Sequence, residues 1–276
     1  MAAAGNKETV LYKDAADYSH VRFDRMNLTG SQRPFGIFIH PQGTKFYLTQ
    51  ENISIKEMNL STPYDISTRS SFTASLSLGT GNDAPRSMFF KPDGTKLYIA
   101  DIDDHLYEYT LTTAWDISTG SLTQSKDLQA PFEVLWGNFF KPDGTKFWGC
   151  DPSIDRVRSF DLTTAWDIST INASSYDQSA LLDVSPLSET TPRSIWWSND
   201  GTKVYIVGAG GDRVMMWNAS TPWYTTAITN STGDPDSVLY ISGFEGLPLS
   251  LCFSADGKYM YISGANGDGV DQFVRT

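Results

Sequence analysis

The chain has 276 residues, of which 40% are hydrophobic and 13% aromatic, so it holds enough apolar material for one large globular domain or two ordinary ones. Its formal net charge of -11 opposes binding to phosphate backbones and to anionic lipid surfaces. This composition excludes a disordered chain and argues against nucleic acid or a bare membrane as the main partner.

The N-terminal region contains a predicted arm and a predicted strand. Residues 1–20 precede any repeat and are expected to form a tail or an arm that docks on a neighbouring subunit. They contain no basic region followed by an apolar stretch, and no later segment approaches the length of a membrane span, so we expect a soluble chain without a signal peptide or a membrane insertion. Residues 21–28 follow as the predicted strand.

One pattern returns five times, in copies that start near residues 34, 85, 135, 192 and 248. Each copy carries the string Pro-Asp-Gly-Thr-Lys or a variant of it, with these glycines: Gly43, Gly94, Gly144, Gly201 and Gly257. The glycines stand 50 to 57 residues apart, a spacing typical of one β-propeller blade and too long for most helical solenoid repeats.

Each blade is expected to have four strands. In the second copy, Asp-Gly stands between two apolar runs, Met88–Phe90 and Leu97–Ala100, which is a strong hairpin signal. A third strand follows in the alternating segment Leu106–Leu111, and a more variable fourth strand completes the unit. The sequence therefore predicts an all-β fold, a five-bladed β-propeller of four-stranded antiparallel blades, as a single domain over residues 21–276.

The two ends of the chain are predicted to meet in the last blade. The fifth copy stops at Thr276, before any fourth strand, while residues 21–28 precede the first copy at the spacing where the other copies carry theirs. The N-terminal strand should therefore complete the last blade, which closes the ring and removes two open sheet edges.

A second signature, Trp-Asp-Ile-Ser-Thr, begins at Trp115 and at Trp166. Because it is identical in two copies, we expect these tryptophans to pack between blades and the aspartates Asp116 and Asp167 to hydrogen-bond a nearby Ser or Thr. The motif predicts architecture and not a ligand site.

The start of each innermost strand combines a fixed position with a variable one. One residue is small in every copy, as a narrow central channel requires: Gly36, Ser87, Gly137, Ser194 and Ser250. The residue directly before it varies: Phe35, Arg86, Trp136, Arg193 and Leu249. This variation among otherwise similar copies is where a functional site is expected.

Phe35, Arg86, Trp136 and Arg193 are predicted to rim the channel, beside the acidic turns that join the second and third strands. Stacking on an indole and bidentate hydrogen bonds from arginine suit a polar ligand or a glycan. In the alternative interpretation, Trp136 fills the channel mouth and the arginines pair with local aspartates.

The inventory of chemistry-bearing residues favours a non-enzymatic protein without a cofactor. No nucleophile elbow, phosphate-binding loop or zinc-ligand spacing occurs, and the residues expected to face the channel are mostly apolar: Ile37, Met88, Asn138, Ile195 and Leu251. The oxygen-rich turn with Asn266, Asp268 and Asp271 is the best candidate for Ca²⁺, although it lacks the EF-hand ligand order and is also an ordinary hairpin turn.

The strings Phe-Lys-Pro-Asp-Gly-Thr-Lys-Leu-Tyr and Tyr-Thr-Leu-Thr-Thr-Ala-Trp-Asp-Ile-Ser-Thr resemble the repeats of propellers in bacteriophage tail and fibre-associated virion proteins, and more distantly NHL-like and lactonase-like propellers. The resemblance implies a structural protein of a virion that recognises the host surface. Its partners would be other virion proteins, copies of itself, and a host glycan or protein. The alternatives are a lectin-like carbohydrate-binding propeller and a lactonase- or glycosidase-type enzyme.

Overall fold

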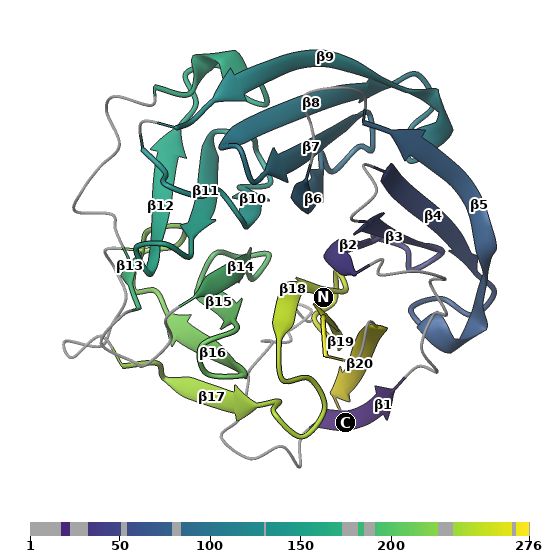
Figure 1. Ribbon diagram of the computed structural model, residues 1–276, viewed down its shortest axis with the longest axis vertical. Helices are drawn as coiled ribbons and strands as arrows, with labels where there is room; N and C mark the ends of the chain where they lie inside the picture. The colour runs from purple at the N-terminus through teal and green to yellow at the C-terminus, as the bar shows by residue number, and fades with distance from the viewer. Residues whose placement is uncertain are drawn as a thin grey trace, which may run out of the picture.

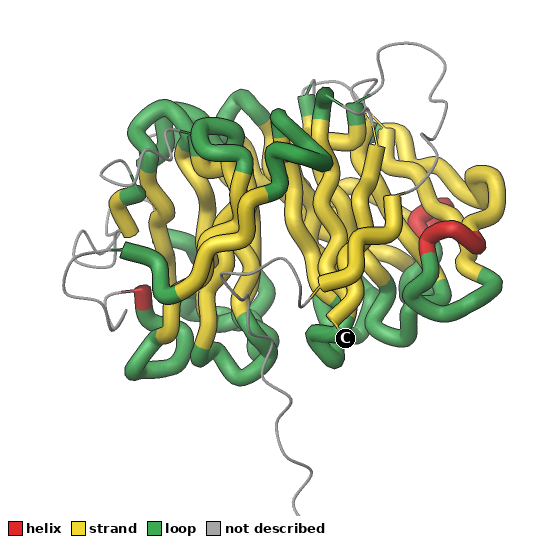
Figure 2. Tube along the Cα trace, turned by 90° about the horizontal axis from the view of Figure 1, so that it is seen from below, coloured by secondary structure: helices red, strands yellow, loops and turns green. Residues whose placement is uncertain are grey.

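The computed structural model describes residues 18–22 (backbone only), 33–50, 54–78, 84–129, 131–172, 182–184, 191–225, 234–266 and 269–275. The strands form five four-stranded antiparallel sheets, which stand around a central axis as the blades of a β-propeller (Figure 1). Seen from the side, the strands run between the two faces of the ring, and turns and loops cover both faces (Figure 2). The predicted fold class is therefore confirmed.

The blades follow one another along the chain. The first consists of β2 (Pro34–Ile39), β3 (Lys45–Gln50), β4 (Ser54–Leu60) and β5 (Arg69–Ser77). The second consists of β6 (Pro85–Phe90), β7 (Lys96–Asp101), β8 (His105–Leu111) and β9 (Gly120–Asp127). The third consists of β10 (Asn138–Phe140), β11 (Lys146–Asp151), β12 (Arg156–Asp161) and β13 (Leu182–Asp183).

The last two blades differ in how they are completed. The fourth consists of β14 (Pro192–Trp197), β15 (Lys203–Gly208), β16 (Arg213–Asn218) and β17 (Ser237–Tyr240). The fifth consists of β18 (Pro248–Phe253), β19 (Tyr259–Gly264), β20 (Gly269–Arg275) and the N-terminal strand β1 (Tyr18–Arg22). Between these elements, the described residues contain no helix long and apolar enough to cross a bilayer.

The ring is closed by the pairing of β1 with β20, from Tyr18 opposite Arg275 to Arg22 opposite Asp271 (Figure 1). This closure confirms the prediction that the N-terminal strand completes the last blade. The strand lies earlier in the chain than residues 21–28, because it begins at Tyr18. Residues 23–28 and the predicted arm up to residue 17 lie outside the described part of the chain.

The two sequence signatures of a blade, the turn glycine and the Trp-Asp-Ile-Ser-Thr string, are in direct contact. The turn glycine Gly94 has a φ of 73°, a region that L side chains rarely adopt, and a Cβ added there would lie 2.3 Å from Trp115 Nε1. The Trp115 N–H donates to the Gly94 carbonyl at 3.0 Å. The same arrangement of glycine and aromatic residue recurs in three further blades, at Gly43, Gly144 and Gly201. The indole or phenol ring therefore covers the turn of its own blade.

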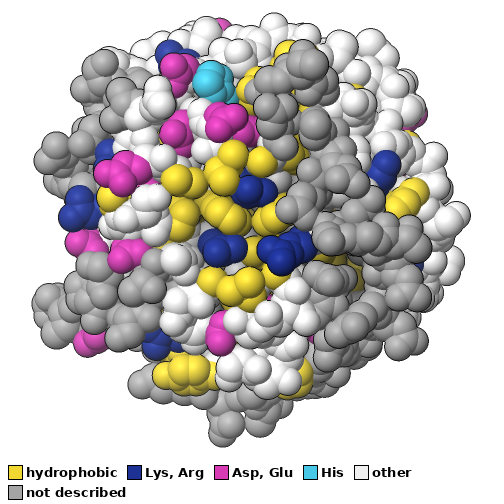
Figure 3. All heavy atoms as spheres, in the orientation of Figure 1, with side chains coloured by type: hydrophobic (Ala, Val, Ile, Leu, Met, Phe, Trp, Pro, Cys, Tyr) yellow, Lys and Arg dark blue, Asp and Glu magenta, His cyan; other side chains and the backbone are white. Residues whose placement is uncertain are grey.

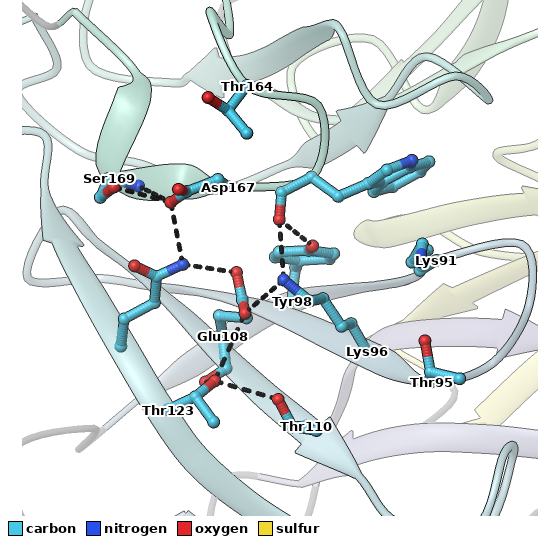
Figure 4. Close-up of polar contacts among 12 residues, drawn as sticks. Lys91, Thr95, Lys96, Tyr98, Glu108, Thr110, Thr123, Thr164, Asp167 and Ser169 are labelled. Carbon is cyan, nitrogen blue, oxygen red and sulfur yellow. Dashed lines mark hydrogen bonds and ion pairs between the residues drawn. The ribbon is translucent and has the colours of Figure 1, made fainter.

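The same signature joins neighbouring blades. The carbonyl of Trp166 accepts from Tyr98 Oη at 2.8 Å and from Lys96 Nζ at 3.0 Å, both in the preceding blade. Lys96 also pairs with the buried Glu108 at 2.7 Å (Figure 4). Asp167 Oδ1 accepts from the N–H and the hydroxyl of Ser169. These contacts confirm that the signature is part of the architecture, with its tryptophan between blades.

The innermost strands leave little space at the centre. A Cβ added at Gly36 would lie 2.8 Å from Ser87 Cα, so the small residues are a steric requirement of closure. Beyond them, aromatic side chains from four blades contact one another, with centroid distances of 5.0 to 6.1 Å: Phe38, Phe89, Phe139 and Trp196. These residues meet across the ring. The residues one position earlier in the inner strands face a neighbouring blade and not the channel, contrary to the prediction. The side-chain amide of Asn138, for example, donates a hydrogen bond to the Tyr98 carbonyl.

Candidate binding site at the channel mouth

A β-bulge at the start of the inner strand turns one side chain of a blade out of the sheet. In β6 and β7, Pro85 lies opposite Asp101 and Ser87 lies opposite Ala100, so the register of the ladder shifts at Arg86. β14 has the same shift of register around Arg193. A bulge inserts an unpaired residue and changes the direction of its side chain. The shift of register falls at the variable residue of the first, second, fourth and fifth blades, whereas in the third blade Trp136 precedes β10.

Four of the variable residues come together there. The Cζ atom of Arg86 lies over the Phe35 ring, 4.2 Å from its centroid, and over the Trp136 ring at 4.8 Å. The guanidinium group of Arg193 also lies over the Trp136 ring, with its Cζ atom 4.3 Å from the ring centroid. The rings of Phe35 and Trp136 meet edge-on at 6.0 Å. The structure thus joins the four sequence-predicted residues, from four different blades, in one cluster, here called the mouth cluster.

The contacts within the mouth cluster decide what it presents to a ligand. Both arginines use the face of the Trp136 indole, which is the electron-rich part of the ring. The indole is therefore a support for two guanidinium groups and not an open platform for a sugar ring. The alternative, in which Trp136 fills the mouth and the arginines pair with local aspartates, agrees with the half-buried position of Trp136 and with the charge of Arg86 that acts on Asp101. It does not by itself explain why two guanidinium groups lie over one indole.

Buried acids of the turns hold the segments that carry the cluster. Asp101, at the end of β7, accepts from the Ala84 N–H at 3.1 Å, two residues before Arg86. Asp104 accepts from the Leu135 N–H at 2.6 Å, directly before Trp136. These acids position the mouth cluster. The sequence predicts the acidic turns but not this role, because the spacing of the aspartates does not show which backbone N–H donates to each carboxylate.

Burial shifts the titration of these positioning acids. It raises the pKa of Asp104 from 3.8 to about 6, and the charges of Asp151 and Asp103 act in the same direction, whereas the hydrogen bond from Leu135 opposes the shift. Burial also raises the pKa of Asp101, against its amide hydrogen bonds and the charge of Arg86. Relative to the unfolded chain, the folded state therefore stabilises the neutral form of Asp104.

Replacing Asp104 with asparagine is expected to change how stability depends on pH. Because the pKa of Asp104 is about 6 in the folded chain and 3.8 in the unfolded one, its contribution is fully present below 3.8 and is lost as the pH rises through 6. Asparagine keeps the acceptor for Leu135 but does not titrate. From pH 7.5 to pH 4, the wild type should gain about 1–2 kcal/mol in free energy of unfolding relative to Asp104→Asn. Urea denaturation measures this, and an equal difference at both pH values would contradict it.

The surface around the mouth combines basic and apolar groups. Figure 3 looks along the ring axis onto one face, where Lys and Arg side chains lie near the centre among hydrophobic ones and Asp and Glu side chains lie farther out. Although the chain has a formal net charge of -11, the basic side chains near the centre of this face form a local region of positive charge.

The candidate calcium turn is described only in part. Asn266 lies in the turn after β19, where its N–H donates to Glu245 Oε1 at 2.9 Å, and Asp271 is buried in β20. Asp268 lies outside the described residues. Among the residues that the structure describes, no three His, Cys, Asp or Glu side chains are grouped to hold a metal ion. Calcium binding at this turn stays a prediction.

Glu245 is a positioning acid that sequence reasoning missed. A Cβ added at Gly264 would lie 2.0 Å from Glu245 Cδ, so this side chain fills the space where a side chain at the end of β19 would stand. Gly264 occupies the place in its blade that Asp101 occupies in the second. Glu245 Oε1 also accepts from the Leu247 N–H at 3.0 Å, just before β18. The sequence signal for this role is that Gly264 replaces the acid found at this place in the second blade, so that another residue must supply the carboxylate.

Comparisons with known proteins add little on activity. No protein-family model and no curated protein matches the chain. Among solved structures, it is similar to a putative 6-phosphogluconolactonase from Bacteroides uniformis, with 14% sequence identity over 84% of this chain and 64% of that chain and a TM-score of 0.48. The chain thus spans less than two thirds of that protein's length. An identity this low carries no statement on what the chain binds or converts.

Proposed function

We propose that this chain is a non-enzymatic recognition propeller that binds a cell-surface ligand at the channel mouth. The observation that carries this proposal is the mouth cluster, in which Arg86 and Arg193 stack on Trp136 and Arg86 also stacks on Phe35. Arginine and tryptophan are the residue types that dominate recognition surfaces, and here they lie at the centre of one face of a rigid ring.

The variation between blades supports a binding role for the mouth cluster. The small residue next to each cluster position is a steric requirement of the ring, and it is Gly or Ser in all five blades. The cluster position itself holds Phe, Arg, Trp, Arg and Leu. If this position served only the packing of the ring, similar blades would use similar residues. Its diversity makes one asymmetric site and not five equal ones.

The resemblance of the repeat to phage tail and fibre-associated propellers supports a virion setting for this recognition. In that setting the chain is a structural part of the particle, with other virion proteins or copies of itself as neighbours and a host glycan or protein as ligand. Co-sedimentation of the chain with purified particles tests this setting separately from the binding site.

The binding proposal is tested with the triple variant Arg86→Ala/Trp136→Ala/Arg193→Ala on a panel of bacterial surface glycans and intact cells. We expect the wild type to bind at least one member of the panel and the triple variant to lose at least about tenfold in affinity, because the stacked arginines are removed. Thermal denaturation shows whether the variant still folds, since only a folded variant gives a meaningful comparison.

The outer rim of the ring offers a matched control. Lys56 lies over the Phe72 ring at 5.9 Å, which is a cation–aromatic pair on β4 and β5, away from the channel. The double variant Lys56→Ala/Phe72→Ala should bind like the wild type. Equal binding by the wild type and the triple variant, or no binding by the wild type across the panel, would refute the proposal.

A further inference from the structure

Residues 131–136, here called the entry segment, lead into the inner strand of the third blade without forming a strand themselves. This inner strand, β10, begins only at Asn138 and has three residues, whereas the inner strands of the other four blades have six. The Trp136 N–H donates to the Cys150 carbonyl at 2.9 Å, at the very end of the segment. Contacts other than a sheet ladder must therefore hold the rest of the entry segment.

Two carboxylates fasten the entry segment from the two adjoining blades. Asp104, in the turn after β7 of the second blade, accepts from the Leu135 N–H at 2.6 Å. Asp151, at the end of β11 of the third blade, accepts from the Glu133 N–H at 2.9 Å. Side-chain acids thus replace part of the ladder that the other inner strands use, and they act directly before Trp136.

Asp104 differs from the other buried acids that hold the segments of the mouth. Only 5% of Asp104 is exposed, and among the described residues the Leu135 N–H alone donates to its carboxylate. Asp101 and Asp151 each accept from two backbone N–H groups, one at each oxygen. A carboxylate that accepts several hydrogen bonds is stabilised as an anion. The anion of Asp104 is therefore the least stabilised of the three.

Three further carboxylates act on Asp104. Asp103 lies in the same turn, Asp127 at the end of β9 and Asp151 at the end of β11. Burial and these three charges raise the pKa of Asp104 to about 6, against the hydrogen bond from Leu135. The other charged groups on the adjoining elements act on Asp101 or Asp151: Arg86, Arg158 and Glu133.

We infer that Asp104 is a proton-sensitive tie, which fastens the entry segment, and Trp136 with it, more firmly in acid than at neutral pH. When the segment opens, the carboxyl group of Asp104 becomes hydrated and its affinity for a proton falls. Opening therefore releases a proton and becomes easier as the pH rises. The contribution of Asp104 to closure is fully present below its ordinary pKa of 3.8 and is lost as the pH rises through about 6. This device belongs to the free chain and goes beyond the proposed function.

Amide hydrogen exchange of the full chain without ligand tests the inference. The exchange rate of the Leu135 N–H, divided by its intrinsic rate at each pH, gives the opening constant of the entry segment. In the wild type we expect this constant to rise about three- to tenfold from pH 5 to pH 7.5. In Asp104→Asn, which keeps the acceptor but does not titrate, it should stay constant.

The Thr95 N–H is a matched reference within the same chain. It donates to Asp93 Oδ1 at 3.0 Å, so it is also tied by an aspartate. Burial would raise the pKa of Asp93, but hydrogen bonds from Lys91 and Thr95 lower it to about 2. Asp93 is thus ionised at both pH values, and the opening constant of Thr95 should not change between them.

A second readout is independent of any variant. The ¹³C signal of the Asp104 carboxyl group should titrate with a midpoint near 6. A midpoint at or below 3.8 would overturn the inference. So would a constant value for Leu135 in the wild type, or an equal rise at Thr95 or in Asp104→Asn, because the effect would then not come from Asp104.

The outcomes separate this tie from the proposed function. If the exchange of Leu135 depends on pH as expected and no glycan or cell binds, the tie stands and the recognition role fails. If the chain binds at the channel mouth but the exchange of Leu135 does not depend on pH, the recognition site stands and the tie is refuted.

Discussion

Replacing Gly94 with alanine is expected to lower the free energy of unfolding by about 3–5 kcal/mol. The new residue would have to adopt a φ of 73°, and its Cβ would lie 2.3 Å from the indole of Trp115. The indole must then leave the turn, which also disturbs the Trp115 carbonyl that binds Lys45 and Tyr47 of the preceding blade. Urea denaturation followed by circular dichroism measures the loss.

Gly243 provides the control for this substitution. A Cβ added at Gly243 would meet no described atom within 4 Å, and no positive φ is recorded there. Gly243→Ala should therefore change the free energy of unfolding by less than about 0.5 kcal/mol. Similar losses from the two substitutions would mean that the contact between turn and tryptophan does not stabilise the blade.

Replacing Glu108 with alanine is expected to cost about 3–5 kcal/mol, because it leaves the Lys96 ammonium beside a buried site without its carboxylate. Only 3% of the Glu108 side chain is exposed, and its second oxygen accepts from Gln124 Nε2 at 2.8 Å (Figure 4). Gln124 in turn donates to Asp167 of the next blade at 3.2 Å. The substitution therefore loosens the joint between the second and third blades.

The third blade contains the matched control. Lys146 holds the place of Lys96, but its partner Asp161 has a side chain that is 78% exposed. An exposed ion pair contributes little to stability, so Asp161→Ala should cost less than about 1 kcal/mol. If both substitutions cost the same small amount, the buried pair does not stabilise the joint, and the blades are held by apolar packing alone.

The fold could be predicted from the sequence because the pattern of one blade occurs in it five times. The turn glycines, the strand pattern and the missing fourth strand of the last copy were enough for the blade number and the ring closure. The contact of Gly94 with Trp115 could not be predicted, because the two signatures are separated by two strands and a residue such as Trp115 rarely adopts a positive φ, here 63°.

The candidate site was predictable in its members but not in its geometry. Variation at one position of the repeat singled out Arg86, Trp136 and Arg193, and the structure brings them into contact. The stacking of both arginines on one indole depends on a bulge and on side-chain directions that no spacing encodes. Glu245 could not be predicted as a positioning acid, because it reaches its place from a loop outside the repeated strands.

The most direct test of ligand binding at the channel mouth is a titration of ¹⁵N-labelled protein with the panel glycan that the wild type binds, observed at the indole N–H signals and assigned by Trp→Phe variants. Trp136 lies in the mouth cluster, whereas Trp115 and Trp166 cover the turns of their own blades. The account predicts that the Trp136 signal shifts in a saturable way while those of Trp115 and Trp166 do not move. Saturable shifts of Trp115 or Trp166 with an unchanged Trp136 signal would place the ligand elsewhere and contradict it.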